Sequence, residues 1–453
     1  MDFSCHAFSG CLFSKKRVIL LYKTCKAKKK GTFHMKITGI IAEYNPFHNG
    51  HLYQIRKIRE ETDTDFIIVA MSGDFVQRGM PAIVDKYTRA KMALACGADL
   101  VLELPVIWAT ASAEYFATAG VRLFEQTGCV DRLCFGAETS DIALLNRIAD
   151  CLTQEPDFYR DVLNAQLKSG KNFPSARAAA LTAFLGDADG ALSAVLASPN
   201  NILAIEYLKA LASGTGNISP YPIVREGNRY HSKSISGIHP SATAIRSLLV
   251  GKAASLSALQ SEQLSNAMPA SALSVFSEAL SAGKITDADD FSSILRYLLL
   301  SRSVEELAAA PDCNPDIARR LKGNLFSFTD FTQFTALNQT KDTTGTRISR
   351  IFTHQLLGIS DTDYTVAKES GIVPYIRPLG FRKSSTAVLS QIKKQASVPL
   401  IGKLADARQK LSASAFSVLE KDIFAADLYE QVLSQKTHVA ARNEYTREMV
   451  LLP

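Results

Sequence analysis

The first 140 residues alternate between short apolar runs and segments with helical spacing, and this alternation is the strongest constraint on how the chain folds. Four runs are apolar almost throughout and are predicted strands: 36–42, 65–71, 98–104 and 132–135. Strands of this kind are buried on both faces, as in a parallel sheet that is covered by helices on either side. We therefore predict an α/β fold with a doubly wound parallel sheet, in which ligands bind at the carboxyl ends of the strands.

The first predicted strand stops at an Asn-Pro pair, and the chain restarts as a helix that begins with His-Asn-Gly-His, residues 48–51. A helix N-terminus presents unpaired N–H groups and the positive end of the helix dipole, both of which favour a phosphate. Gly50 lets the backbone approach this phosphate closely. His48 and His51 are spaced to donate hydrogen bonds to a phosphate oxygen during an in-line attack at phosphorus. The motif therefore predicts catalysis of nucleotidyl transfer by His48 and His51.

The same histidines have a plainer interpretation as ordinary turn and helix-start residues. The His and Gly content of this chain makes a chance His-x-Gly-His motif expected in roughly one such sequence in a hundred. The position of the motif directly after a buried strand favours the phosphate-binding interpretation.

The formal net charge of +7 looks like a sign of nucleic-acid binding, but its distribution removes that meaning. Residues 1–34 hold eight basic residues and one acidic residue, whereas the rest of the chain holds 43 of each. Any nucleic-acid surface outside the extension must then be a local patch. We expect the extension 1–34 to have no structural role, as a disordered tail or the product of an upstream start codon; a basic RNA-contacting arm is the alternative.

The sequence shows neither an export signal nor a membrane span, because its short apolar run at 18–22 has only five residues. The eight cysteines are scattered and lack a Cys-x-x-Cys spacing. We predict that they are reduced, mostly buried thiols, that they form no metal site, and that the protein resides in the cytoplasm without membrane contact.

Composition and chain breaks divide the sequence into four predicted parts. They are the extension 1–34, a sheet domain 35–250 with a helical insertion at about 141–197, a helical domain 251–325, and a helical and basic C-terminal region 326–453. Near the end of the sheet domain, Ser241 and Arg246 lie at the start of a predicted helix, which suits a second phosphate. In the C-terminal region, Arg347 and Arg350 share one face of a predicted helix.

Three long motifs carry a resemblance to a known family: residues 43–51 (EYNPFHNGH), 71–79 (MSGDFVQRG) and 97–105 (GADLVLELP). Shorter matches lie at 135–138 (FGAE), 198–203 (SPNNIL), 346–348 (TRI) and 375–381 (YIRPLGF). With these motifs the chain resembles the tRNA(Met) cytidine acetate ligase family from Met35 to about Leu433. The resemblance implies the Rossmann-like sheet of the HxGH nucleotidyltransferase superfamily.

The resemblance also implies an activity. Enzymes of this family use ATP to activate acetate as acetyl-adenylate with release of pyrophosphate, and then transfer the acetyl group to N4 of the wobble cytidine of elongator tRNA(Met). The implied cofactors are ATP and Mg²⁺, and the implied partners are acetate and elongator tRNA(Met). Carried over to this chain, the ATP-binding residues are Ile41, Ala42, Glu43, Tyr44, Asn45, Pro46, Phe47, His48, Asn49, Gly50, His51, Leu52, Tyr53, Gln54, Gly136, Asn200, Asn201 and Arg225.

Other expected ligand-binding residues are basic or lie at a helix start. The helix beginning at Ser241 is similar to the second phosphate-binding motif of the superfamily, although Pro240 and Ala242 replace an Ile and a Ser of that motif. Because acetate carries a negative charge, it needs a cation beside ATP. The candidates for phosphate or acetate are Lys86, Arg89, Arg78, Ser241 and Arg246, and those for tRNA are Arg347, Arg350, Arg377, Arg382 and Lys383.

Two rival functions remain compatible with the residues. The first is a nucleotidyltransferase that joins a nucleotide to a small phosphorylated metabolite, which would leave some 200 residues after Arg246 without a role. The second is an RNA-binding protein with a vestigial nucleotide site, and the intact His48, Gly50 and His51 argue against it.

Overall fold

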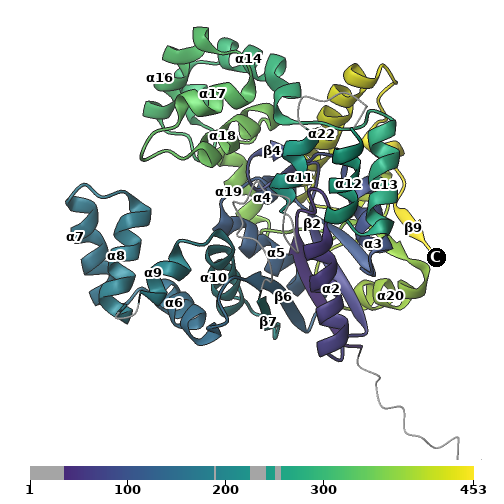
Figure 1. The fold of residues 1–453 in the computed structure, drawn as a ribbon, viewed down its shortest axis with the longest axis horizontal. Coiled ribbons are helices and arrows are strands. Elements are labelled where there is room, and N and C mark those ends of the chain that lie inside the picture. Colours follow the sequence, from purple (N-terminus) through teal and green to yellow (C-terminus); the bar gives the residue numbers. More distant parts are fainter. Residues whose placement is uncertain (1–34, 188–189, 225–240, 250–256) are drawn as a thin grey trace, which may run out of the picture. The chain divides into compact units, whose positions relative to one another are not determined.

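The structure, a computed structural model, describes residues 35–187, 190–224, 241–249 and 257–453. Its centre is a seven-stranded sheet in the order β7-β6-β1-β2-β5-β8-β9 (Figure 1). The strands are β1 (Ile37–Ala42), β2 (Phe66–Ser72), β5 (Leu100–Leu104), β6 (Arg132–Ala137), β7 (Ser219–Val224), β8 (Pro378–Arg382) and β9 (Val450–Leu452). A separate hairpin consists of β3 (Phe75–Val76) and β4 (Met80–Pro81).

The five neighbouring strands from β7 to β5 are parallel, which confirms the predicted doubly wound α/β fold. From β1 the chain first adds β2 and β5 on one side and then β6 and β7 on the other. The order therefore reverses between β1 and β6, the position at which open sheets of this kind bind ligands. The helices next to the sheet are α2 (Asn49–Glu61), α3 (Lys86–Ala95), α5 (Ala113–Thr127) and α10 (Pro199–Ala212).

Helices cover both faces of the sheet, as alternate side chains of β1 show. Ile40 belongs to the core shared with α2 and α3. Its neighbours Gly39 and Ile41 face α5, where a Cβ atom on Gly39 would lie 2.6 Å from the ring of Phe124. On the α5 side, a Cβ atom on Gly120 would overlap the side chain of Ile41. The two glycines thus allow strand and helix to pack closely.

The C-terminal region contributes strands to this sheet, which the sequence did not predict. β8 pairs with β5 in the antiparallel direction, and β9 pairs with β8 in the parallel direction. Helix α13 (Ala270–Ser281) packs against α3 and adds Phe276 to the core of the sheet. Lys36–Pro453 accordingly forms one compact unit. The part boundaries at 250 and 325 stay a prediction.

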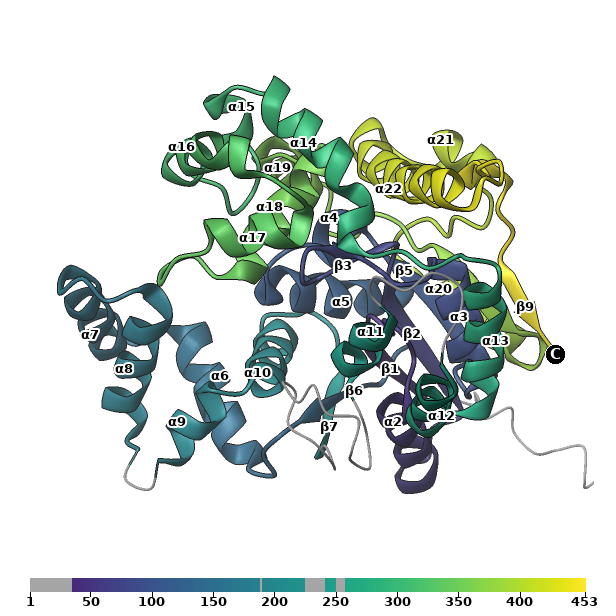
Figure 2. The same ribbon diagram turned by 45° about the horizontal axis from the view of Figure 1, so that its top comes forward.

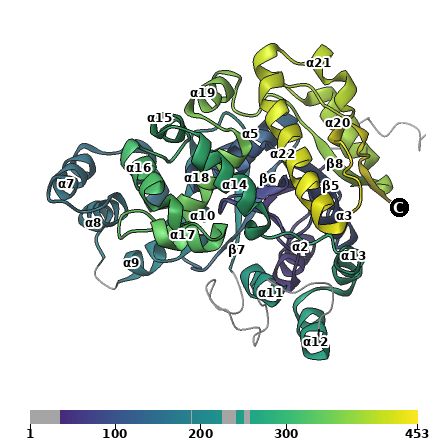
Figure 3. The same cartoon turned by 90° about the horizontal axis from the view of Figure 1, so that it is seen from above.

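The predicted insertion is helical, with α7 and α8 lying away from the sheet in Figures 1 and 3. Its helices are α6 (Ile142–Gln154), α7 (Asp157–Lys168), α8 (Phe173–Leu185) and α9 (Ala191–Leu196). The other helices are α4 (Val106–Ala109), α11 (Ala242–Leu249), α12 (Ala258–Ala267), α14 (Ser292–Ser301), α15 (Val304–Ala308), α16 (Pro315–Asn324), α17 (Phe331–Asn338), α18 (Gly345–Leu357), α19 (Asp361–Glu369), α20 (Thr386–Gln395), α21 (Ala407–Lys410) and α22 (Ala413–Thr437), with short 3-10 turns η1 (Ala288–Phe291), η2 (Leu325–Ser327), η3 (Lys383–Ser385), η4 (Leu404–Asp406) and η5 (Glu444–Thr446). Figure 2 shows α14–α18 gathered on one side of the sheet and α22 on another.

Two expectations from composition concern thiols and membranes. The five cysteines of the described chain are free thiols, four of them buried, as predicted. Within the part of the chain that the structure describes, no helix combines the length and the apolar character that a membrane crossing requires.

Candidate active site

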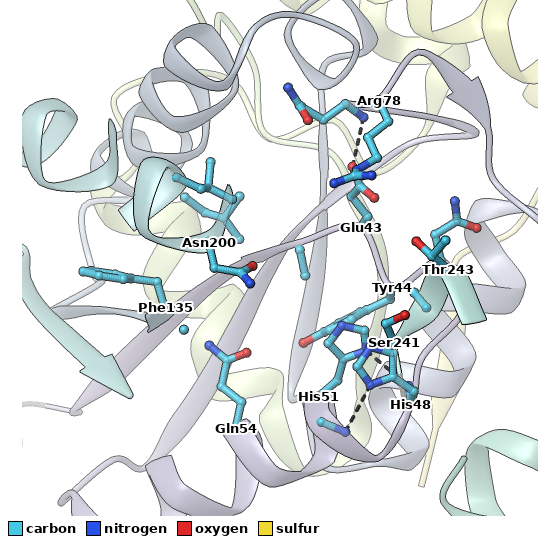
Figure 4. Close-up of a pocket in the computed structure, with 18 of the residues that line it drawn as sticks. Glu43, Tyr44, His48, His51, Gln54, Arg78, Phe135, Asn200, Ser241 and Thr243 are labelled. Carbon is cyan, nitrogen blue, oxygen red and sulfur yellow. Dashed lines mark hydrogen bonds between the residues drawn. The ribbon is translucent and has the colours of Figure 1, made fainter. Parts of the chain in front are cut away.

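A cavity opens at the carboxyl ends of β1 and β6, where the strand order reverses (Figure 4). It brings together most of the predicted ATP-binding residues, namely Ile41, Ala42, Glu43, Tyr44, Asn45, His48, Gly50, His51, Tyr53, Gln54, Gly136 and Asn200. Arg78, Ser241 and Arg246 from the predicted phosphate and acetate set also line it. The sheet topology therefore gathers residues that lie up to 205 positions apart in the sequence, and it does so where a ligand is expected.

His48 and His51 form a capping box at the start of α2. His48 is the N-cap, and its Nδ1 accepts a hydrogen bond from the backbone N–H of Gly50 at 3.1 Å. In return, His51 Nδ1 accepts from the backbone N–H of His48 at 3.2 Å. Because each Nδ1 is an acceptor, the ring proton of each histidine is on Nε2. Local backbone contacts thus set both imidazoles as Nε2–H donors, the form that can stabilise negative charge on a phosphate.

Aromatic packing holds the two imidazoles in place. The rings of His48 and His51 stack with their centroids 3.7 Å apart, and the ring of Tyr44 meets His51 edge-on at 4.7 Å. Phe47 packs against both Tyr44 and His51. Tyr44 is fully buried, and burial raises the pKa of its hydroxyl, so it stays neutral. The histidines therefore have one defined orientation before any ligand binds.

Helix α11 faces the same cavity from the opposite side of the turn. Ser241 caps it by accepting a hydrogen bond from the N–H of Ala244 at 3.1 Å. Arg246 donates through Nη1 to the carbonyl of Asn45 at 2.7 Å, and through Nη2 to the hydroxyl of Thr243 at 3.2 Å. A second helix N-terminus and a cation thus adjoin the histidine turn, in spite of the alanine at position 242, which makes this edge of the cavity suitable for a polyphosphate.

The two neighbouring asparagines of α10 have different positions. Asn200 lines the cavity, and its Nδ2 donates to the carboxylate of Glu138 at 2.6 Å. Asn201 is buried away from the cavity, where its Oδ1 accepts from the backbone N–H groups of Glu138 and Thr139 at 2.7 and 3.3 Å. Asn201 therefore holds the loop after β6 in place, while Asn200 forms part of the cavity wall.

The loop between β3 and β4 supplies Gln77 and Arg78 to the cavity. The Gln77 backbone N–H donates to Glu43 Oε1 at 3.1 Å, and Figure 4 shows Arg78 directed toward the same carboxylate. Gly79 follows in the left-handed region at φ 73°, and a Cβ atom there would overlap the backbone of Arg350 in α18. The loop is thus pressed against the C-terminal helices, and only a glycine permits this contact.

Several predicted residues do not line the cavity. Pro46, Phe47, Asn49 and Leu52 belong to the turn and to α2, but Phe47 is buried in the core and Asn49 bonds to the carbonyl of Asn266. Arg225 lies outside the described residues. Some lining residues were not predicted, because they belong to helices and strands whose periodicity looks like that of any core element: Phe116, Phe135, Leu203, Tyr207 and Ile223. Gln77, Ala242 and Thr243 also line the cavity and were not predicted.

Lys86 was a candidate for acetate or phosphate, but the structure places it in a buried ion cluster formed by Lys86, Glu103, Arg377 and Glu444. Lys86 Nζ lies 2.7 Å from a carboxylate oxygen of Glu103 and 2.7 Å from one of Glu444. Arg377 pairs with Glu103 at 2.8 Å and also with Glu444. All four side chains are at most 5% exposed. The expectation that Lys86 would meet a ligand is corrected, because the C-terminal segment around Glu444 covers it.

Arg89 is also fully buried and does not line the cavity. Its guanidinium donates to the carbonyls of Val84, Glu43, Ser72 and Gly73. Burial lowers the pKa of Arg89, and the nearby carboxylate of Asp74 acts in the opposite direction. Arg89 thus ties together the strand ends that frame the cavity, and this structural use corrects the expectation of a ligand contact.

The predicted tRNA residues are likewise separated. Arg377 belongs to the buried ion cluster, so it is not available to RNA. Arg382 is half-buried and Lys383 is exposed. Arg347 Nε donates to the carbonyl of Asp312 at 2.9 Å, and Arg350 Nε pairs with the Asp312 carboxylate at 2.6 Å. Both arginines of α18 therefore converge on Asp312.

Comparison with known proteins agrees with the geometry. The family model described as HIGH Nucleotidyl Transferase matches residues 35–444. A tRNA(Met) cytidine acetate ligase of Acetivibrio thermocellus is 36% identical over 419 residues, which are 92% of this chain and 100% of the relative. One of Clostridium kluyveri is 39% identical over 402 residues, which are 86% of this chain and 96% of the relative. The chain belongs to the tRNA(Met) cytidine acetate ligase family.

Solved structures of this family share the whole fold. The apo crystal structure of Thermotoga maritima TmcAL matches with a TM-score of 0.86 and 28% identity over 92% of this chain and 100% of that chain. A second crystal structure of the same protein, bound with alpha-thio ATP, matches with a TM-score of 0.83 at the same identity and coverage. The match includes the helices and strands after α11. A nucleotidyltransferase that acts on a small metabolite would need little beyond the sheet domain, so these elements favour the larger tRNA-modifying enzyme.

Proposed function

We propose that this protein is a tRNA(Met) cytidine acetate ligase that uses ATP to acetylate a tRNA cytidine. The observation that carries the proposal is the pair of stacked imidazoles, both set as Nε2–H donors by the capping box at the sheet switch point. Family membership supports the same activity, since the relatives bear this name over nearly the full chain.

In the first half-reaction, an acetate oxygen attacks the α-phosphorus of ATP and pyrophosphate leaves. The N-terminus of α2 and the Nε2–H groups of His48 and His51 stabilise the charge that develops on the phosphate oxygens. Arg246 and the N-terminus of α11 bind the leaving pyrophosphate. Gly136, Gln54 and Asn200 line the cavity beside β6 and the loop after it, and are proposed to contact the nucleoside.

Mg²⁺ is proposed to arrive with ATP. Among residues 35–187, 190–224, 241–249 and 257–453, no group of three or more His, Cys, Asp or Glu side chains is arranged to hold a metal ion. Mg²⁺ suits such a site because it commonly keeps several waters and binds through substrate phosphates. The ion would lower the charge of the polyphosphate, and the chain's own residues would bind and orient the complex.

Arg78 is proposed to hold acetate. Of the described residues that line the cavity, Arg78 and Arg246 are the ones with a fixed positive charge, and Arg246 lies at the phosphate edge. Arg78 is on the loop between β3 and β4, and Figure 4 shows it beside Glu43 and away from His48 and His51. A guanidinium matches a carboxylate in shape and charge.

The second half-reaction transfers the acetyl group from acetyl-adenylate to N4 of the wobble cytidine of elongator tRNA(Met). Base chemistry of this kind requires the target base to leave its stack. Arg347 and Arg350 on α18, Arg382 at the end of β8 and Lys383 in η3 are proposed to contact the tRNA backbone. A protein that acts on tRNA in this way is expected in the cytoplasm.

The decisive experiment incubates the protein with ATP, Mg²⁺, isotope-labelled acetate and tRNA(Met), followed by mass spectrometry of the nucleosides. We expect labelled N4-acetylcytidine that depends on both ATP and acetate. No labelled acetylcytidine, or its formation without ATP, would reject the proposed function.

The acetate assignment has its own test. Replacing Arg78 by Gln removes a charge-assisted contact of about 1.5–3 kcal/mol, so KM for acetate should rise roughly 10- to 100-fold while KM for ATP stays unchanged. Acetyl transfer from pre-formed acetyl-adenylate should be retained. The exposed Arg319→Gln is the matched control. An unchanged KM for acetate in Arg78→Gln would exclude Arg78 as the acetate residue.

A further inference from the structure

Glu43 supplies the one carboxylate among the described residues that line the cavity. Its backbone carbonyl accepts from Arg89 Nη1 at 2.7 Å, and its side-chain Oε1 accepts from the backbone N–H of Gln77 at 3.1 Å. Figure 4 shows the carboxylate in the cavity beside Arg78. The group is therefore held at the end of β1, on the side where acetate is proposed to bind.

The two proposed half-reactions differ in their need for a base. When an oxygen of ionised acetate bonds to the α-phosphorus, the bond from phosphorus to the pyrophosphate oxygen breaks and no proton is released. When N4 of cytidine bonds to the carbonyl carbon of acetyl-adenylate, the C–O bond to AMP breaks, AMP leaves with the electron pair, and N4 must give up one proton. A proton acceptor near N4 is thus required in the second step alone.

We propose that Glu43 is the general base of the acyl-transfer step. This assignment rests on the proposed function. A carboxylate oxygen of Glu43 accepts a hydrogen bond from the cytosine amino group and takes up the proton as the bond between N4 and the acetyl carbon forms. A carboxylate is also the group that recognises the amino group of cytosine in nucleic-acid complexes.

The histidines do not fit this role. His48 Nδ1 and His51 Nδ1 are acceptors for backbone N–H groups, and their Nε2 atoms already carry protons. They serve as donors to phosphate and have no basic nitrogen directed at the second substrate. The division of labour follows: the histidine donors at the start of α2 act in adenylation, and the Glu43 acceptor directly after β1 acts in transfer.

The test separates the two steps with Glu43→Gln, which keeps the acceptor for the Gln77 N–H and the size of the side chain but removes the base. Because Glu43 also belongs to the predicted ATP-binding set, exchange is measured beside transfer, and acetate-dependent ATP–pyrophosphate exchange should fall far less than transfer does. Single-turnover transfer from pre-formed acetyl-adenylate to tRNA(Met) should fall about a hundredfold or more. Azide, a small anionic base, should partly restore transfer in Glu43→Ala, and the exposed Glu278→Gln should behave as wild type.

Two results would overturn the assignment. Normal transfer by Glu43→Gln would mean that the phosphate of the adenylate takes the proton. A fall in exchange as large as the fall in transfer in the same variant would place Glu43 in the first step. Failure of the proposed function would look different, because then the wild-type protein itself would show no acetate-dependent exchange and no acetylcytidine.

Discussion

The carboxyl edge of the sheet carries two groups of charged or polar side chains that differ in accessibility. At β1 and β6, Glu43, Arg78 and the histidine pair line the cavity. Two strands away from β1, at β5, the buried ion cluster pairs the cations of Lys86 and Arg377 with the carboxylates of Glu103 and Glu444. The difference comes from what covers them, because η5 closes the cluster with Glu444 and nothing in the described chain fills the cavity.

Charged side chains at the edge of this sheet thus serve two purposes, structural pairing and ligand binding, which look the same in the sequence. In the buried ion cluster every charge has an opposite partner at close range, so the cluster joins α3, β5, the start of β8 and η5 and adds no reactivity. In the cavity the polar groups are held by backbone contacts and remain directed toward a ligand. Substitutions in the cluster should therefore reduce stability, and substitutions in the cavity should reduce catalysis.

The largest effect is expected from Glu444→Gln. The variant removes the carboxylate that pairs with both Lys86 and Arg377. Glu103 remains between the two buried cations, and the Asp74 carboxylate lies 3.9 Å from Lys86 Nζ. The free energy of unfolding should therefore fall by about 3–5 kcal/mol. Chemical denaturation measures this loss. The exposed Glu420→Gln is the control and should change little. Equal stability of both variants would mean that the buried ion cluster does not stabilise the fold.

The stabilisation that Glu444 provides should depend on pH, and the shift in its pKa gives the direction of this dependence. Burial raises the pKa of Glu444, but the cations of Lys86 and Arg377 outweigh burial and lower this pKa to about 2. The ordinary value in the unfolded chain is 4.5, so the stabilisation is present above pH 4.5 and is lost as the pH falls from 4.5 toward 2. The difference in Tm between wild type and Glu444→Gln should be constant above this range and shrink within it.

The next effect concerns His48. His48→Ala should lower acetate-dependent ATP–pyrophosphate exchange by roughly a hundredfold or more, because one donor to the transition state is lost. His48→Asn is the sharper variant, since asparagine is a good N-cap and keeps α2 intact while it removes the imidazole. Both variants should bind ATP almost normally. His51→Ala should resemble His48→Ala, and wild-type exchange in either variant would remove the catalytic role.

A smaller effect is expected at α18, which belongs to neither group. Replacing Arg347 and Arg350 together by Gln should leave exchange intact and weaken tRNA acetylation. The slope of log K against log salt should drop by about 0.7–0.9 for each phosphate contact removed. Asp312→Asn is the control: it takes the ionic partner from Arg350 and keeps both cations, so RNA binding should persist. Parallel losses in both variants would show that these residues only hold the Asp312 loop.

The smallest effect is expected from deletion of residues 1–34. Removal of the seven net positive charges should change neither exchange nor tRNA acetylation, because the described residues of the cavity and of the buried ion cluster all lie in the remaining chain. Binding titrations with tRNA(Met) measure this directly. A large loss of affinity would identify the extension as an RNA-binding arm.

The sequence predicted what depends on near neighbours. The parallel strands follow from apolar runs, and the His-x-Gly-His turn follows from a strand that ends next to a helix start. Even the contacts that orient His48 and His51 lie within three residues of each other. Such features need little information from the rest of the chain, since periodicity and capping act over one or two turns.

Which charged residues line the cavity and which are buried in ion pairs depends on the tertiary structure alone. Lys86, Arg89 and Arg78 look equivalent in sequence, yet Glu444 closes over Lys86 from 358 positions away, strand-end carbonyls surround Arg89, and Arg78 reaches the cavity. β8 and β9 were also hidden, because they are short and gain stability only from pairing beside β5. Burial depends on contacts with segments that are distant in the sequence. The same type of side chain is therefore a buried ion-pair partner or a ligand-binding group, according to which segments cover it in the fold.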